Sequence, residues 1–287
     1  PIDIWNIEQK EVEGNNSTDK KKIEIIDNEN TSQSSIYDLQ SQKELNKVQV
    51  ESSLNSQEIK IIGLYDPEDY SLKIDMWSNS NGDQLKYHFS NLSKIQLSND
   101  ATELMNIALL TNSYNPDINM KQSEFLKIKS DWLIKANDRA LIEEYLVKNQ
   151  IFNLHHELTR FLVDQYLSES NIEKACDLLF KNNEIIENEY LSKFNLYCLI
   201  NAGRSDEAQL IFDLKKELGF NDKYFENKIN YLFGYSNESN LEISENSILD
   251  FHLAHRTNVD FIFEPKTDTS PLIWKYLSTS NLLYKID

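Results

Sequence analysis

The feature that most constrains the fold is a 33-residue step that repeats between positions 121 and 220. Polar or small turn segments recur at this step, at 137–142, 170–175 and 203–208. A period of about 33 to 34 residues with two helices per unit is typical of a solenoid of helical hairpins. We therefore predict an all-α fold with three hairpins over residues 121–220. Large apolar residues recur at the same step in three series: Phe125, Leu158 and Leu191; Ile128, Phe161 and Phe194; Leu146, Leu179 and Phe212.

The second unit carries the fullest version of the pattern, in Leu162, Tyr166, Ser170, Ile172, Ala175 and Leu179. Gly203, Ala208 and Phe212 repeat part of it in the third unit. This order of residue types resembles the tetratricopeptide repeat, in which small residues allow close helix packing and a tight turn. The resemblance implies a right-handed α-α superhelix, a TPR-like solenoid with a concave face. The match is partial, because Ile142 stands where alanine is usual and no unit has the closing proline.

The flanking regions divide the rest of the chain. Residues 1–57 are polar and turn-rich with almost no apolar period, so we predict a flexible or extended arm. Residues 58–120 are expected to form N-terminal cap helices, one from Asp83 and one from Asn99. Residues 221–287 are expected to form less regular helices that cap or extend the stack, at 223–233, 245–256 and 271–278.

Composition argues against several classes of function. Lys and Arg number 29 against 47 Asp and Glu, and a net charge of −18 repels nucleic-acid phosphates and anionic membranes. Six glycines and five prolines are fewer than a β-sandwich or a nucleotide-binding α/β fold uses at its turns. No apolar run reaches the roughly 20 residues of a membrane helix. We therefore expect no nucleic-acid partner, including RNA bound in the pentatricopeptide manner, and no membrane span within this segment.

The sequence contains no motif for catalysis or cofactor binding. It has no nucleophile elbow, no phosphate-binding glycine loop and no His-Glu-x-x-His helix. We predict that the chain is not an enzyme and that it binds no cofactor. His252 and His255 lie three residues apart on one predicted helix, but zinc needs a third and usually a fourth ligand. An ordinary surface pair is therefore the expectation, and no metal site is predicted.

The two cysteines, Cys176 and Cys198, fall on neighbouring predicted helices. Buried free thiols are the simpler expectation, because a free cysteine behaves as a small apolar residue. A disulfide stays open as the alternative. It requires Cα atoms within about 7 Å and an oxidising compartment.

Lys127, Arg160 and Lys193 recur at the 33-residue step on the first helix of each unit, and we call these cations the basic ladder. In the tetratricopeptide frame its positions face the concave groove, and cations there suit an acidic peptide or a C-terminal carboxylate. The alternative is local pairing with Asp131 and Asp164, which follow the first two cations by four residues. The third cation has Tyr197 in that place, which predicts a freer Lys193. The predicted partner-binding residues of the concave face are Lys127, Arg160, Lys193, Tyr190, Tyr197 and Asn201.

More loosely, the chain resembles a group of exported alphaproteobacterial proteins without an established function. The shared features are Gly63-Leu64, Asp66-Pro67, Asp75, Trp77 and Leu109-Leu110-Thr111. The resemblance implies a bacterial cell envelope or periplasm, with the cytoplasm as the alternative. Because the first residue is Pro1 rather than Met, we expect a processed or excised segment of a longer protein.

These observations predict a non-catalytic scaffold or adaptor that binds a protein or peptide partner in the concave face. Two alternatives stay open. The first is an accessory helical region of a larger, peptidoglycan-cleaving enzyme of the cell envelope, which a catalytic domain elsewhere in the reading frame would favour. The second is a structural subunit of a fixed assembly, which poor solubility or oligomerisation of the isolated chain would favour.

Overall fold

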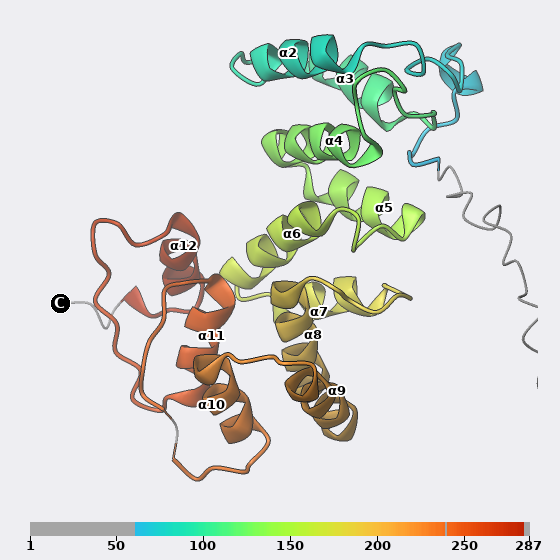
Figure 1. Ribbon diagram of the computed structural model, residues 1–287. Helices are drawn as coiled ribbons and strands as arrows, with labels where there is room; N and C mark the ends of the chain where they lie inside the picture. Colours follow the sequence, from blue (N-terminus) through green and yellow to red (C-terminus); the bar gives the residue numbers. More distant parts are fainter. Residues whose placement is uncertain (1–60, 239, 284–287) are drawn as a thin grey trace, which may run out of the picture. The chain divides into compact units, whose positions relative to one another are not determined.

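The computed structural model describes residues 61–238 and 240–283 (Figure 1). These residues form eleven α-helices, one short 3-10 helix and no β-strand. The all-α prediction is therefore confirmed for this part of the chain. The arm predicted for residues 1–57 lies outside the described residues.

The helices follow one another along the chain, with short turns inside the middle pairs and longer connections before α11 and α12 (Figure 1). The 3-10 helix η2 (Glu68–Tyr70) precedes α2 (Gly82–Leu92) and α3 (Asn99–Leu110). Six helices follow in pairs: α4 (Gln122–Ala136) and α5 (Arg139–Asn149), α6 (His156–Ser168) and α7 (Ile172–Phe180), α8 (Glu189–Asn201) and α9 (Ser205–Glu217). The last three are α10 (Lys223–Leu232), α11 (Ile248–Thr257) and α12 (Pro271–Thr279). The first residues of α5, α7 and α9 are related by the 33-residue step.

Local capping explains where several helices begin. The side chains of Asp138 and Asn171 accept hydrogen bonds from the backbone N–H groups of Leu141 and Lys174, which fixes the starts of α5 and α7. Helix α11 begins at Ile248, later than the predicted 245, because Ser247 caps it through the N–H of Asp250. Such caps satisfy backbone donors that have no partner inside the helix.

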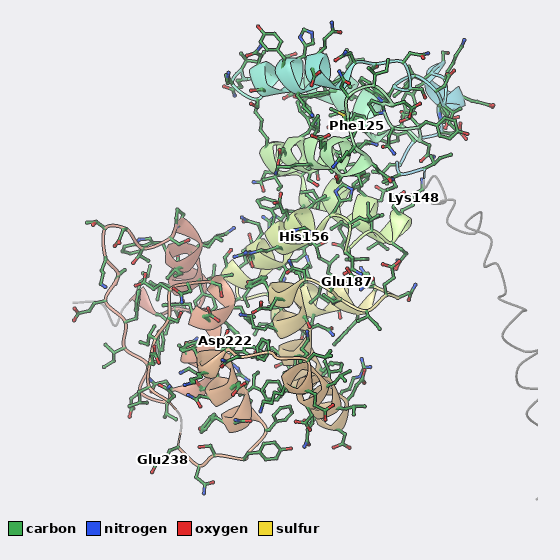
Figure 2. The ribbon with its side chains drawn as sticks, in the orientation of Figure 1. Phe125, Lys148, His156, Glu187, Asp222 and Glu238 are labelled. Atoms are coloured by element: carbon green, nitrogen blue, oxygen red, sulfur yellow. A yellow bond between two sulfur atoms is a disulfide. The ribbon has the colours of Figure 1, made fainter. Side chains whose placement is uncertain are left out.

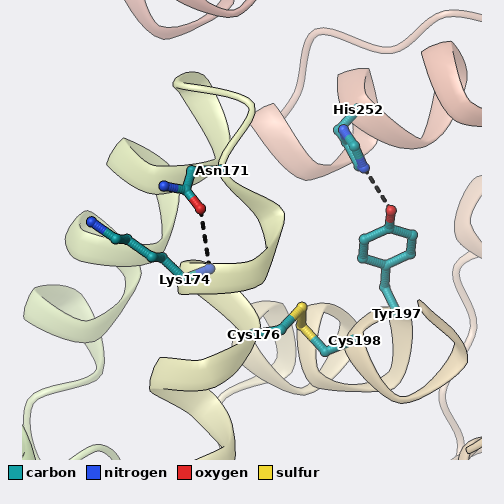
Figure 3. The surroundings of a disulfide bond; sticks show 6 residues. All are labelled: Asn171, Lys174, Cys176, Tyr197, Cys198 and His252. Atoms are coloured by element: carbon teal, nitrogen blue, oxygen red, sulfur yellow. Dashed lines mark hydrogen bonds between the residues drawn. A yellow bond between two sulfur atoms is a disulfide. The ribbon is translucent and has the colours of Figure 1, made fainter. Parts of the chain in front are cut away.

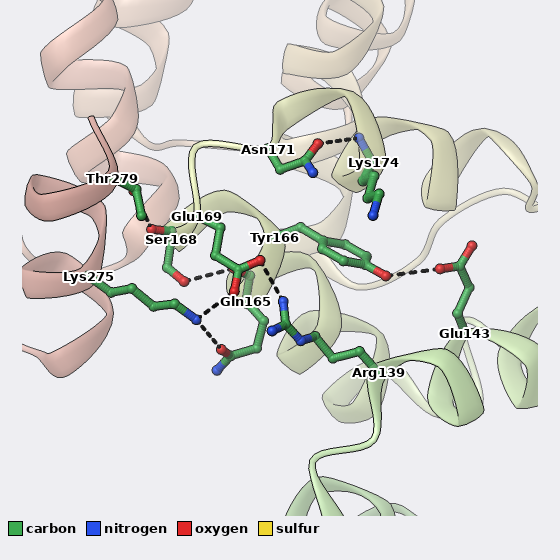
Figure 4. Close-up of polar contacts among 10 residues, drawn as sticks. All are labelled: Arg139, Glu143, Gln165, Tyr166, Ser168, Glu169, Asn171, Lys174, Lys275 and Thr279. Carbon is green, nitrogen blue, oxygen red and sulfur yellow. Dashed lines mark hydrogen bonds and ion pairs between the residues drawn. The ribbon is translucent and has the colours of Figure 1, made fainter. Parts of the chain in front are cut away.

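Helix α6 occupies the centre of the packing. It packs against α4, α5, α7 and α8, and also against the C-terminal helices α11 and α12. Figure 4 shows the contact with α12, where the Lys275 ammonium lies 2.9 Å from Glu169 and the Thr279 hydroxyl donates to the Ser168 carbonyl. The C-terminal helices therefore return to α6 instead of only continuing after the last pair.

The first described segment is held in place by side chains of α4 and α5. The buried Lys129 ammonium donates to the Ile62 carbonyl at 3.0 Å, and Lys148 donates to the Leu64 carbonyl at 2.5 Å. Asn149 bonds both the N–H and the carbonyl of Gly63. Burial lowers the pKa of Lys129 to about 8. A side chain at position 63 would meet the backbone of residues 110 and 112, so only glycine fits there.

None of the helices within the described ranges combines the length and the apolar character that a membrane crossing requires.

Candidate functional site

The predicted partner-binding residues lie on α4, α6 and α8, the first helices of the three pairs. On α4, the Lys127 ammonium lies 2.9 Å from Glu157 of α6 and 3.2 Å from Asp131 of its own helix. These hydrogen bonds, chiefly that with Glu157, raise the pKa of Lys127. Lys127 is exposed, but its charge is paired.

On α6, Arg160 belongs to a cluster of three side chains. Its guanidinium lies 3.4 Å from Asp164 and stacks over the ring of Tyr190, 4.3 Å from the centroid. The Tyr190 hydroxyl donates to the same carboxylate at 2.5 Å. Burial raises the pKa of Asp164 to about 6 and raises that of Tyr190 well above its usual value. The cluster ties α6 to the first turn of α8.

On α8, the prediction of a freer Lys193 is wrong. The side chain is 14% exposed, and its ammonium lies 2.9 Å from Asp222 and 3.7 Å from Glu189. Asp222, labelled in Figure 2, also caps α10 by accepting from the N–H of Phe225. The expectation failed because the lysine reaches forward to Asp222 at the start of the next helix and also lies near Glu189, four residues earlier on its own helix.

The three cations therefore share one geometry. Each contacts the start of the next helix on this side of the fold, through Glu157 of α6, Tyr190 of α8 and Asp222 before α10. The ladder joins successive helices to one another. Its charges are already bound within the described part of the chain, so an acidic ligand would have to displace these partners.

Tyr197 is not an exposed contact residue. It is 2% exposed, and its hydroxyl is hydrogen-bonded at 2.8 Å to His252 Nε2 on α11 (Figure 3). The Tyr276 hydroxyl on α12 is hydrogen-bonded at 2.8 Å to Nδ1 of both His252 and His255. α11 covers Tyr197, so this side chain does not line an open surface. Asn201, at the end of α8, is exposed.

The expectation of a surface histidine pair is also wrong for His252, which is 1% exposed. Burial lowers its pKa to about 3. Within the described ranges, no group of three or more His, Cys, Asp or Glu side chains is placed to hold a metal ion.

Cys176 and Cys198 form a disulfide that joins α7 to α8 (Figure 3). Their Cα atoms lie 5.3 Å apart. The expectation of free thiols is therefore wrong, and the alternative that was left open holds. The spacing in the sequence could not decide this, because it does not fix which faces of two packed helices meet.

An apolar groove lies between the α7–α8 loop and α9, and we call it the α7–α9 groove. It has a volume of about 500 Å³, and its apolar lining is Leu179, Phe180, Ile185, Ile186, Leu199, Ile211, Leu214 and Leu218. Ile185 is 89% exposed and Leu218 is 79% exposed. Leu210, one helical turn before Leu214, extends the exposed stripe along α9. We call Leu210, Leu214 and Leu218 the leucine stripe.

Sequence reasoning missed this groove, although the 33-residue step contains a signal for it. The positions that correspond to Leu210 in α5 and α7 are Glu144 and Asp177, and both are exposed. Those that correspond to Leu214 are Lys148 and Lys181. Charged residues therefore become leucines in the third pair while the positions remain at the surface. A comparison of exposed positions between the units, and not only of buried ones, would have found the stripe.

Comparisons of this chain with protein-family models, with curated proteins and with solved structures gave no match. Function must therefore be argued from the site itself.

Proposed function

We propose that this chain is a non-catalytic protein-binding scaffold, built as a TPR-like right-handed solenoid, whose docking surface is the α7–α9 groove. The observation that carries the proposal is the leucine stripe of α9, exposed beside an apolar groove. Exposed apolar residues that lie singly on a surface need no explanation, whereas a contiguous patch marks an interaction site. The occupant is a segment of a partner protein.

The groove supports docking better than the basic ladder does. Each ladder cation already has a partner on another helix, and Tyr197 lies under α11. In the groove, by contrast, Ile185, Leu210 and Leu218 expose most of their surface to water. Burying such side chains against a partner yields roughly 25 cal/mol for each Å² removed from water.

We also propose an oxidising compartment, of which the bacterial cell envelope is an example. The disulfide between Cys176 and Cys198 supports this, because disulfides persist in oxidising compartments and are rare where cellular reductants keep thiols reduced.

Site-specific photo-crosslinking in cells tests the docking surface. A photoreactive residue replaces Leu214 in the groove, Lys127 on α4, or Leu104 on α3 as an exposed control. We expect one protein to be crosslinked from position 214 and not from 104, and the purified partner to bind wild type but not Leu210→Ser/Leu218→Ser. A partner captured from position 127 alone would move the binding site to the inner face and overturn the proposal for the groove.

A further inference from the structure

The outer side of the leucine stripe carries a row of acids. Asp206, Asp213 and Glu217 all lie along the edge of α9 that faces away from the groove, as 3.6 residues per helical turn dictates. All three are exposed. None of their side chains forms an ion pair or a hydrogen bond with another residue in the described ranges. We call these residues the acidic edge.

This edge differs from the acids that join neighbouring helices. Glu157, Glu143 and Glu169 each pair with a lysine or an arginine of a neighbouring helix. The acidic edge instead places three unpaired carboxylates along about 16 Å of helix, which repel one another and attract a row of cations. The opposite side of the stripe is mixed in charge, with Glu207 paired to Arg204 and with Lys215 lining the groove.

We infer that the α7–α9 groove binds a basic amphipathic helix of a partner protein. This inference rests on the proposed function and names its partner. The apolar face of the helix lies on the leucine stripe and in the groove, and its lysines or arginines lie along the acidic edge. An amphipathic helix presents apolar residues at i, i+3, i+4 and i+7, which matches leucines spaced by four residues on α9.

Charge also argues against a second copy of this chain as the occupant. Two copies would bring together net charges of −18 and two acidic edges, and like charges oppose association. The predicted charge of the partner is the reverse of the one that the basic ladder suggested. The carboxylates of the acidic edge are unpaired, whereas the ladder cations are neutralised within the fold.

The test uses two synthetic helical probes of about 18 residues, five turns of helix, that differ only in charge. Both carry leucines on one face, and one has lysines where the other has glutamates. Binding to the full chain is measured by fluorescence anisotropy at low and at physiological salt. The variants are Asp206→Lys/Asp213→Lys/Glu217→Lys at the acidic edge and Leu210→Ser/Leu214→Ser/Leu218→Ser at the stripe. A matched control, Asp69→Lys/Asp100→Lys/Glu103→Lys, makes the same charge change at exposed acids of η2 and α3.

We expect wild type to bind the lysine probe roughly tenfold more tightly than the glutamate probe, with a preference that weakens as salt rises. The edge variant should reverse this preference, and the control variant should keep it. Equal binding of both probes, lost only in the stripe variant, would overturn the basic-helix inference and leave apolar docking intact. Binding that the stripe variant retains would overturn the groove as the docking surface, and with it the proposed function. Sedimentation that shows wild type, but not the stripe variant, to be dimeric would identify a second copy as the occupant and overturn the inference.

Discussion

Two successive contact regions between helices, which we call seams, correspond to each other through the 33-residue step. Different kinds of side chain line them. The first seam lies between α5 and α7 with their following loops, and polar side chains cross it. The Lys181 ammonium lies 2.7 Å from Glu143, and Gln150 accepts from the N–H of Asn183. Asn153 donates to the Ile185 carbonyl at 2.8 Å.

The second seam lies between α7 and α9, where the 33-residue step replaces most of these polar groups. Leu214 stands in place of Lys181, and Ile186 stands in place of Asn153. Between described residues, no hydrogen bond joins the α7–α8 loop to α9. The guanidinium of Arg204, just before α9, lies over the ring of Phe180, the last residue of α7. The result is the α7–α9 groove.

By the same 33-residue step, Cys176 occupies the position that corresponds to Glu143. In the second pair's contact with α5, Glu143 accepts a hydrogen bond of 2.9 Å from Tyr166 of α6 (Figure 4). In the third pair's contact with α7, Cys176 of α7 is bonded covalently to Cys198 of α8. A covalent link between α7 and α8 does not depend on polar contacts across the seam. The comparison indicates that the disulfide stabilises the part of the fold that carries the α7–α9 groove.

Removing the disulfide should have the largest effect. The cysteines are 22 residues apart, and a loop of this size lowers the entropy of the unfolded chain enough to contribute about 3 kcal/mol. We expect Cys176→Ala/Cys198→Ala to lower the free energy of unfolding by about that amount, measured by urea denaturation. Reductant should destabilise wild type similarly and leave the double variant unchanged. A wild type equally stable with and without reductant would contradict the role given to the bond.

Acidification should weaken the packing of the segment before α6 on α4 and α5, by a smaller amount. His155, just before α6, is buried and hydrogen-bonded to the Ser130 hydroxyl at 2.6 Å and to the Tyr145 hydroxyl at 3.3 Å. Burial lowers its pKa to about 3. The unfolded chain therefore binds a proton below pH of about 6.5 that the folded chain does not, so stability falls as pH falls towards 3.

Because of His155, the free energy of unfolding is expected to fall by about 2 kcal/mol between pH 6.5 and pH 5. Urea titrations at several pH values should show a shallower pH dependence for His155→Gln than for wild type. Comparing the two removes the contributions of His252 and Asp164, which both proteins share. Parallel curves would show that His155 does not titrate differently in the folded chain.

The helices could be predicted because local signals determine them. Apolar periodicity placed the middle helices, and side chains such as Asp138 and Asn171 mark their first turns. The start of α11 was predicted too early, because acids and polar residues before Ser247 also resemble a first turn. Where several residues could cap a helix, the cap that forms in the structure determines the first residue of the helix.

The candidate site was harder to predict because it depends on which faces meet. The recurrence of Lys127, Arg160 and Lys193 was correct as a pattern, but a one-dimensional step cannot show that each cation reaches the following helix. The burial of Tyr197 arises from α11, which comes more than 50 residues later in the chain. No local signal encodes that contact.

Glu143→Gln should have a moderate effect on the first seam. Burial alone would raise the pKa of Glu143, but hydrogen bonds from Lys181 and Tyr166 outweigh it and keep the pKa below its usual value. Neutralising the carboxylate should cost about 1 kcal/mol, since a hydrogen bond to a charged group is lost and a partly exposed ion pair contributes little. A double-mutant cycle with Tyr166→Phe measures the coupling. Additive effects of the two substitutions would show that the hydrogen bond does not stabilise the seam.

Leu214→Lys should have the smallest effect on stability and a clear effect on binding. It gives the second seam the residue that the first seam has at the corresponding position. The new lysine has no glutamate partner at the corresponding position, because the residue that corresponds to Glu143 is Cys176, which forms the disulfide. Replacing an exposed leucine by a lysine that gains no ion pair should change the free energy of unfolding by less than about 0.5 kcal/mol.

A charge within the leucine stripe should nevertheless weaken binding of the lysine probe by about tenfold or more, because it places a cation in the apolar contact and opposite other cations. Leu104→Lys on α3, which alters another exposed leucine, should leave binding unchanged. If Leu214→Lys bound the probe as wild type does, the open seam would have no part in recognition, and its difference from the closed seam would concern stability alone.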